Sequence, residues 1–128
     1  MMNVDRREQE RWLPRELTFV ALRPDFARLG KILDISRDGL RFQYITSTDK
    51  EDQATDAAPL DIDLFLSKNG YYLAGVPCKM IYDNKVEKGA LAPANLEYRL
   101  CGLQFGDLTK GQTNLLEFYL SNHTTDSV

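Results

Sequence analysis

Short stretches in which apolar and polar side chains alternate are the feature that most constrains the fold of this chain. In residues 60–66 leucine and isoleucine alternate with aspartate, and in residues 40–44 leucine, phenylalanine and tyrosine alternate with arginine and glutamine. A period of two places apolar side chains on one face of a β-strand and polar side chains on the other. Both stretches therefore predict strands with one buried face.

Four further stretches have the β-branched and aromatic composition of strands. They are Glu16–Leu22, about Ala27–Leu33, Tyr71 to about Tyr82, and about Leu96–Phe105. Turn signals separate them, including Asn69-Gly70, which is typical of a hairpin, and Gly75 and Pro77 indicate a bulge or an edge. Six short strands of this kind predict a mainly β fold, a small closed or nearly closed antiparallel barrel.

One element near the C-terminus has a helical period instead. Thr109 and Gln112 fit a capping box, and Leu115, Leu116, Tyr119 and Leu120 follow at helical spacing. The pattern predicts a helix over about residues 110–121 that covers an open end or a side of the barrel. With 128 residues the chain is one domain: an arginine-bearing arm (1–15), the barrel with its helix (16–122) and a polar tail (123–128).

Composition excludes several classes of function. The net charge is −3, from 16 basic and 19 acidic side chains, so the whole-protein field does not favour nucleic acid. The single histidine, His123, argues against a multi-histidine metal site and a Ser-His-Asp triad. No apolar run suits a signal peptide or a membrane span. Cys78 and Cys101 lie in apolar runs and are expected to be buried, reduced thiols. We expect a cytoplasmic protein that is not an enzyme and holds no metal or cofactor.

A carboxylate, a hydroxyl and a glycine stand together between the second and third predicted strands, at Asp34, Ser36 and Gly39. The Asp34 carboxylate suits paired donors such as the N–H groups of a guanine edge, and Ser36 can donate or accept. Gly39 permits a positive φ and a close approach of a ligand to the backbone. The same residues also fit an Asx- or Ser-stabilised turn with no ligand.

Arginines cluster in the arm, at Arg6, Arg7, Arg11 and Arg15. A guanidinium pairs bidentately with a phosphate or with O6 and N7 of guanine. Arg7 and Arg11 have the same four-residue spacing as Arg11 and Arg15, so spacing alone leaves the pair open. Ordinary surface charge, partly paired with nearby glutamates, is the alternative interpretation.

The two motifs together resemble the PilZ domain family. Arg-x-x-x-Arg, a β-hairpin and then Asp-x-Ser-x-x-Gly at a strand end occur in the family's order and spacing. Residues 31–40 look like its strand, turn and strand, Gly102-x-x-Phe105 resembles its late strand, and a C-terminal helix follows. The resemblance covers roughly residues 5–122 and implies a six-stranded barrel that binds the bacterial second messenger cyclic di-GMP.

By this resemblance Arg7 and Arg11 are the ligand pair, since Asp5-Arg6-Arg7 looks like the family's usual lead-in. Asp34, Ser36 and Gly39 are the second ligand-binding motif. Arg6 resembles its counterpart in members that hold two stacked nucleotides. The implied function is a receptor or adaptor whose arm closes over cyclic di-GMP, a movement read by an unidentified protein effector in motility, adhesion, exopolysaccharide production or a similar process.

Two other classes of function fit parts of the sequence. A PilZ-like protein-interaction module that does not use the nucleotide would keep the same motifs. A small barrel that binds single-stranded nucleic acid needs a basic groove with stacking aromatics, and the acidic balance argues against it.

For the cyclic di-GMP site that the PilZ resemblance implies, the side chain that would stack on guanine is left open among Met80, Ile81 and Tyr82.

Overall fold

A computed structural model describes residues 11–23, 28–47, 60–66, 70, 72–86 and 95–127. Eight strands and one helix occur in these residues. They are β1 (Trp12–Pro14), β2 (Thr18–Arg23), β3 (Arg28–Ile35), β4 (Gly39–Ser47), β5 (Leu60–Leu66), β6 (Tyr72–Val86), β7 (Leu96–Phe105), α1 (Lys110–Asn122) and β8 (Thr124–Ser127).

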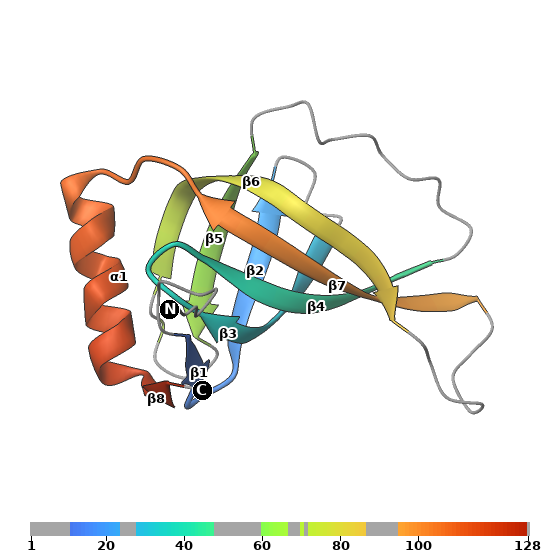
Figure 1. Cartoon of the computed structure of the whole chain (residues 1–128), viewed down its shortest axis with the longest axis horizontal. Helices are drawn as coiled ribbons and strands as arrows, with labels where there is room; N and C mark the ends of the chain where they lie inside the picture. The colour runs from blue at the N-terminus through green and yellow to red at the C-terminus, as the bar shows by residue number, and fades with distance from the viewer. Residues whose placement is uncertain are drawn as a thin grey trace, which may run out of the picture.

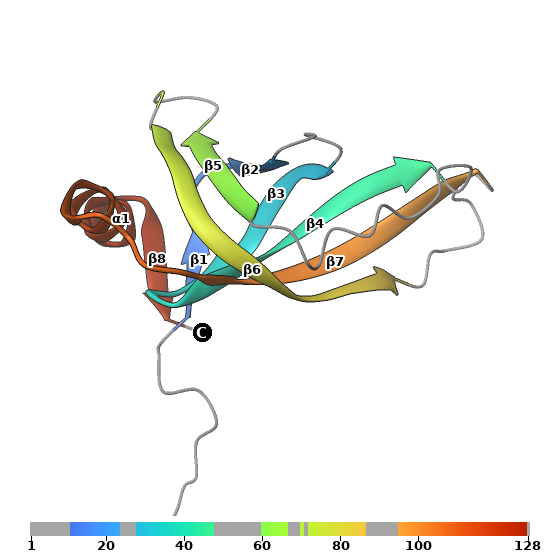
Figure 2. The same ribbon diagram turned by 90° about the horizontal axis from the view of Figure 1, so that it is seen from above.

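Six of these strands form a closed antiparallel barrel (Figure 1). The hydrogen-bonded order is β2-β5-β6-β7-β4-β3, and a further pairing between β3 and β2 closes the ring. The predicted six-stranded barrel is thus confirmed. The long strands β4, β6 and β7 extend away from α1, which lies at the opposite end of the molecule (Figure 2).

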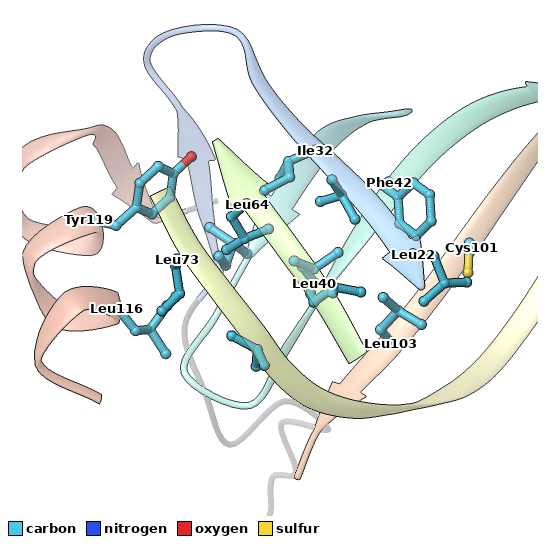
Figure 3. Packing of buried hydrophobic residues seen from close by; sticks show 14 of the residues in the cluster. Leu22, Ile32, Leu40, Phe42, Leu64, Leu73, Cys101, Leu103, Leu116 and Tyr119 are labelled. Carbon is cyan, nitrogen blue, oxygen red and sulfur yellow. The ribbon is translucent and has the colours of Figure 1, made fainter. Parts of the chain in front are cut away.

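The barrel interior is filled by the apolar face of each strand, as the alternating pattern predicted. Leucine, isoleucine and valine dominate, and Leu116 and Tyr119 of α1 complete the packing at one end (Figure 3). The buried cluster comprises Val20, Leu22, Ile32, Ile35, Leu40, Phe42, Tyr44, Leu60, Ile62, Leu64, Leu66, Leu73, Val76, Cys101, Leu103, Leu116, Tyr119 and Leu120.

Helix α1 begins with the predicted capping box. The Thr109 hydroxyl accepts from the Gln112 backbone N–H, and the Gln112 side chain accepts from the Thr109 backbone N–H. The Gln112 amide also donates to the carbonyls of Ala74 and Gly75 in β6, at 3.0 Å each. At the other end of the contact, the Tyr119 hydroxyl lies 2.8 Å from Oγ1 of Thr18 in β2. These contacts fix the helix on the barrel.

Strands β1 and β8 were not predicted. They pair with each other, and β1 also pairs with β3 through Trp12 and Ile35. The end of the expected arm and the start of the expected polar tail are therefore ordered together beside the helix terminus. Strands of three and four residues are too short to show an alternating pattern, which explains why the sequence did not reveal them.

One expectation for β5 was wrong. The alternation in residues 60–66 predicts that Asp63 faces solvent, as does Asp61, yet the Asp63 side chain is buried. A register shift opposite Ile62–Leu64 places Gly75, with a φ of 64°, so that its backbone N–H donates to Oδ1 of Asp63 at 2.9 Å. The predicted bulge at Gly75 thus provides one partner for this buried carboxylate, and Arg23 of β2 provides another, with its Nη1 3.4 Å from Oδ2.

A group of partly buried charges lies at the barrel end away from α1. Oδ2 of Asp83 accepts from the Tyr44 hydroxyl at 2.6 Å and from Arg28 Nε at 3.2 Å, and Oδ1 accepts from Arg99 Nε at 2.8 Å. Arg99 also pairs with Glu97. Two arginines and two carboxylates balance, so this group satisfies itself and ties β3, β4, β6 and β7 together.

Cys101 is buried as expected, whereas Cys78 is only partly buried. Burial raises the pKa of each thiol to about 12. None of the described helical residues forms a segment long and apolar enough to cross a membrane. Within the described ranges, no three His, Cys, Asp or Glu side chains are grouped so that they could hold a metal ion.

Candidate functional site

The turn between β3 and β4 is closed by Ser36. Its backbone N–H donates to the Gly39 carbonyl at 2.8 Å, and its Oγ accepts from the backbone N–H groups of Asp38 and Gly39 at 3.1 and 3.2 Å. The Asp38 carbonyl in turn accepts from the Phe105 N–H of β7 at 2.6 Å. Ser36 is buried and acts here as the Ser-stabilised turn residue that the sequence offered as its alternative.

Gly39 has a role different from the one expected. Its φ lies outside the left-handed region, and it is the first residue of β4. A Cβ at this position would lie 2.0 Å from the carbonyl oxygen of Leu103 in β7. The expectation that Gly39 admits a ligand to the backbone through a positive φ is therefore wrong for this conformation: the space beside it holds strand β7.

Asp34 is a buried carboxylate at the end of β3, 4% exposed. Its Oδ1 accepts from Arg11 Nη1 at 2.7 Å. Its Oδ2 accepts from both Nε and Nη2 of Arg41, at 2.9 and 2.6 Å. The hydrogen bonds to Asp34 raise the pKa of Arg41. Two guanidinium groups on one carboxylate leave one excess positive charge, which suits an anionic ligand.

Arg41 was not predicted as a site residue. Its alternation with the buried Leu40 and Phe42 identified it as outward-facing, but the turn geometry that places it opposite Asp34 was not evident. A register shift between Ile32 and Asp34 produces that pairing.

A row of residues continues from Asp34 across the sheet. Asp34 pairs with Arg41 on β4, Arg41 with Gly102 on β7, and Gly102 with Tyr82 on β6. Tyr82 also lies close enough to Arg41 to contribute, after Asp34, to the raised pKa of Arg41. Arg41 thus lies between Asp34 and Tyr82 in this row, and its guanidinium is hydrogen-bonded to the carboxylate.

The segment that follows Arg11 is anchored on the same turn. Trp12 pairs with Ile35, and the Arg37 guanidinium lies over the Trp12 ring, 5.3 Å from its centroid. Arg37 also forms a two-point ion pair with Glu117 of α1, at 2.7 and 3.2 Å. The turn therefore contacts both the N-terminal segment and the helix.

The structure brings four of the predicted site residues together, Arg11, Asp34, Ser36 and Gly39. Arg6 and Arg7 lie outside the described residues. Arg15 is exposed, and its backbone N–H donates to the His123 carbonyl at the end of α1, at 2.9 Å. His123 caps that helix and bonds to Glu16, 2.8 Å from its Oε1. Arg11 is thus the described arm arginine that contacts the second motif.

A model of the family described as PilZ domain matches residues 5–122. A solved structure of MrkH, described as a c-di-GMP-dependent transcription regulatory factor, superimposes with a TM-score of 0.63 at 18% identity. The match covers 91% of this chain, which spans 50% of the length of the MrkH chain.

The PilZ domain of YcgR from Escherichia coli, solved with c-di-GMP, superimposes with a TM-score of 0.61 at 15% identity over 91% of each chain. The structure of YcgR from Escherichia coli in complex with c-di-GMP superimposes with a TM-score of 0.59 at 14% identity. That match covers 92% of this chain and 46% of the YcgR chain. These likenesses establish the fold. A comparison with curated protein sequences finds no significant match.

Proposed function

The chain belongs to the PilZ domain family, and from that membership we propose that it is a receptor for cyclic di-GMP. The observation that carries the proposal is the contact between the two motifs: Arg11 Nη1 lies 2.7 Å from Oδ1 of Asp34. Solved PilZ structures with the same fold were determined with c-di-GMP bound, which supports the same ligand here.

In the proposed complex, the ligand replaces the contact between Arg11 and Asp34, and each of the two residues binds the ligand. Cyclic di-GMP offers phosphates that suit the Arg11 fork and guanine N–H groups that suit Asp34. When Arg11 turns to the ligand, Oδ1 of Asp34 becomes free to accept from guanine, while Oδ2 remains with Arg41. Arg7 is the second arginine of the pair, and Arg6 supports a second, stacked nucleotide.

Ligand binding thereby moves the arm relative to the barrel. Arg11 precedes Trp12, and Trp12 lies under Arg37, which is paired with Glu117 of α1. A change at Arg11 therefore reaches the helix surface through two contacts. A partner protein that binds this surface reads the arm position. The roles on this path are binding and positioning, and none requires acid–base chemistry.

Titration calorimetry with cyclic di-GMP tests the proposal. We expect saturable binding that is abolished in Arg7→Ala, Arg11→Ala and Asp34→Ala, and Arg6→Ala should reduce the number of nucleotides bound. Arg15→Ala is the matched control, because it shares the four-residue spacing from Arg11 but contacts the helix terminus through its backbone. If Arg15→Ala abolishes binding and Arg7→Ala does not, the pair is Arg11/Arg15. A wild-type protein that shows no saturable heat is not a cyclic di-GMP receptor.

A second candidate is a protein-interaction module that does not use the nucleotide. The observation that favours it is that both oxygens of Asp34 already have partners within the chain. Affinity capture with and without cyclic di-GMP separates the two functions. A receptor changes its partners when the nucleotide is added, whereas a module that ignores the nucleotide captures the same partners in both conditions.

A further inference from the structure

The ring of Tyr82 lies flat against the sheet, because Gly102 has no side chain. A Cβ on Gly102 would lie 2.4, 2.6 and 2.9 Å from Cε2, Cζ and Cδ2 of that ring. An atom meeting the ring edge-on would be much closer to one ring atom than to its neighbours. The similar distances therefore mean that one face of the ring covers the backbone of β7 and the opposite face points away from the sheet.

This ring adjoins the candidate site. Tyr82 is partly exposed, and it pairs across the sheet with Gly102, which pairs with Arg41. Arg41 in turn donates two hydrogen bonds to Oδ2 of Asp34. The Arg41 side chain, between Tyr82 and the carboxylate, is thus fixed by its hydrogen bonds to Asp34. An aromatic ring beside an acceptor with one exchangeable partner is suited to a nucleobase, which stacks through its face and hydrogen-bonds through its edge.

Resting on the proposed function, we propose that a guanine base of cyclic di-GMP stacks on Tyr82, and that Arg41 is the positioning residue that aligns Asp34 with the edge of that base. Stacking on Tyr82 supplies affinity for any purine. Asp34 supplies the preference for guanine, because guanine presents N–H donors at the edge where adenine presents an acceptor.

The neighbouring residues on β6 are poorer platforms. Met80 packs against the buried core of the barrel. Ile81 is exposed, but its aliphatic side chain has no π-face on which a base can stack. Of the three residues that the sequence left open as the stacking platform for guanine, Tyr82 is therefore the one that we propose.

Three variants test the platform by calorimetry with cyclic di-GMP. Tyr82→Leu removes the ring and should weaken binding by about 5- to 150-fold, the range for loss of one base–aromatic stack. Tyr82→Phe keeps the ring and should bind nearly as well as wild type. Gly102→Ala keeps every proposed ligand contact but pushes the ring off β7, so it should weaken binding in the same direction as Tyr82→Leu.

The matched control is Tyr72→Leu, the same substitution on the same strand. Tyr72 is exposed and pairs with Phe65 at the other end of β6, so its loss should leave the affinity unchanged. The guanine H8 resonance of bound ligand gives a signature that a structural role would not produce. A ring current from Tyr82 should shift H8 upfield in wild type and Tyr82→Phe, and the shift should be absent in Tyr82→Leu.

Arg41→Lys tests the positioning role. Lysine keeps the charge but cannot give two hydrogen bonds to one oxygen of Asp34 in the fixed geometry of a guanidinium. We expect the ratio of affinities for cyclic di-GMP and cyclic di-AMP to fall toward one, whereas the H8 shift persists. An unchanged ratio would show that Arg41 does not align Asp34.

The outcomes separate the platform from the receptor function itself. If wild-type protein does not bind cyclic di-GMP, both fail. If wild type binds, and Tyr82→Leu and Gly102→Ala bind equally well with the H8 shift unchanged, the platform is overturned and the receptor function stands. Thermal unfolding identifies any variant that does not fold. Should Tyr82→Leu be one, Gly102→Ala and the H8 shift in wild type decide the matter.

Discussion

Arg11 and Asp34 form an ion pair that joins the N-terminal segment to the end of β3, with 2.7 Å between Nη1 and Oδ1 across 23 positions of sequence. The two partners differ in burial, because 29% of the Arg11 side chain is exposed against 6% of the Asp34 side chain. Arg41 holds the other carboxylate oxygen. Asp34 is therefore the fixed centre of this group, and Arg11 is its contact from the arm.

Asp34→Asn should destabilise the protein more than Arg11→Ala does. The substitution sets an amide against two guanidinium groups that lose their charged acceptor, and we expect the free energy of unfolding to fall by about 1–3 kcal/mol. Arg11→Ala removes a partly exposed partner and should cost about 0–1 kcal/mol. Urea unfolding of both single variants and of the double variant measures the coupling. Equal losses in the two single variants would contradict the central role of Asp34.

Gly39→Ala should destabilise the barrel by a steric effect that is independent of any ligand. The added methyl group would lie 2.0 Å from the Leu103 carbonyl, so β4 and β7 must separate. Overpacking of this kind costs about 1–3 kcal/mol.

The control for that substitution is Gly106→Ala, in which the nearest contact is Cβ of Pro77 at an ordinary 3.4 Å. Thermal unfolding should show a lower midpoint for Gly39→Ala and little change for Gly106→Ala. If Gly39→Ala keeps the wild-type midpoint and loses only ligand affinity, Gly39 is a ligand residue after all.

The sequence predicted the barrel strands and the helix because each carries a local signal. Residues 60–66 alternate over a full strand, and Thr109 and Gln112 form a capping box that needs no information from elsewhere in the chain. Strands β1 and β8 have no such signal, since they exist only through their pairing with each other and with β3.

The candidate site likewise contains residues that a local sequence signal reveals and residues that only strand pairing reveals. Asp34, Ser36 and Gly39 are recognisable because they are close in sequence, although the structure gives Gly39 a packing role. Arg41 and Tyr82 depend on strand register, which includes shifts at Ile32–Asp34 and at Met80–Tyr82. A register shift of one residue reverses which face a side chain occupies, so these partners could not be assigned without the structure.

Stability should fall at alkaline pH because burial raises the pKa of Cys101 from 9.0 to about 12. The unfolded chain loses its thiol proton near pH 9, whereas the folded chain keeps it. The unfolded state therefore binds fewer protons between pH 9 and 12, and the free energy of unfolding decreases as the pH rises through that window. Burial raises the pKa of Tyr44 and Tyr119 in the same direction.

Cys101→Ala isolates the thiol contribution. This variant should be less stable than wild type at pH 8, because Cys101 is fully buried in the core and its loss leaves a small cavity. The difference in urea midpoint should narrow steadily between pH 9 and 10.5, since only wild type has the thiol to ionise on unfolding. A difference that is constant over this range would contradict the raised thiol pKa.

The single tryptophan should report ligand binding directly. Trp12 follows Arg11, pairs with Ile35 and lies under the guanidinium of Arg37, 5.3 Å from the ring centroid. If Arg11 leaves Asp34 for the ligand, the indole moves relative to that charge and its emission changes. We therefore expect a saturable change in Trp12 fluorescence with cyclic di-GMP, at the same concentrations as the calorimetric heat. GMP alone should produce none.

Two variants separate the causes of that signal. Arg37→Gln removes the cation over the ring and should change the starting emission, yet a response to cyclic di-GMP should persist because Arg37 is not a proposed ligand contact. Arg11→Ala should keep a starting emission near that of wild type and lose the response. Saturable heat without any change in emission would mean that the ligand binds while Arg11 stays on Asp34, and the proposed arm movement would then be wrong even though the receptor function holds.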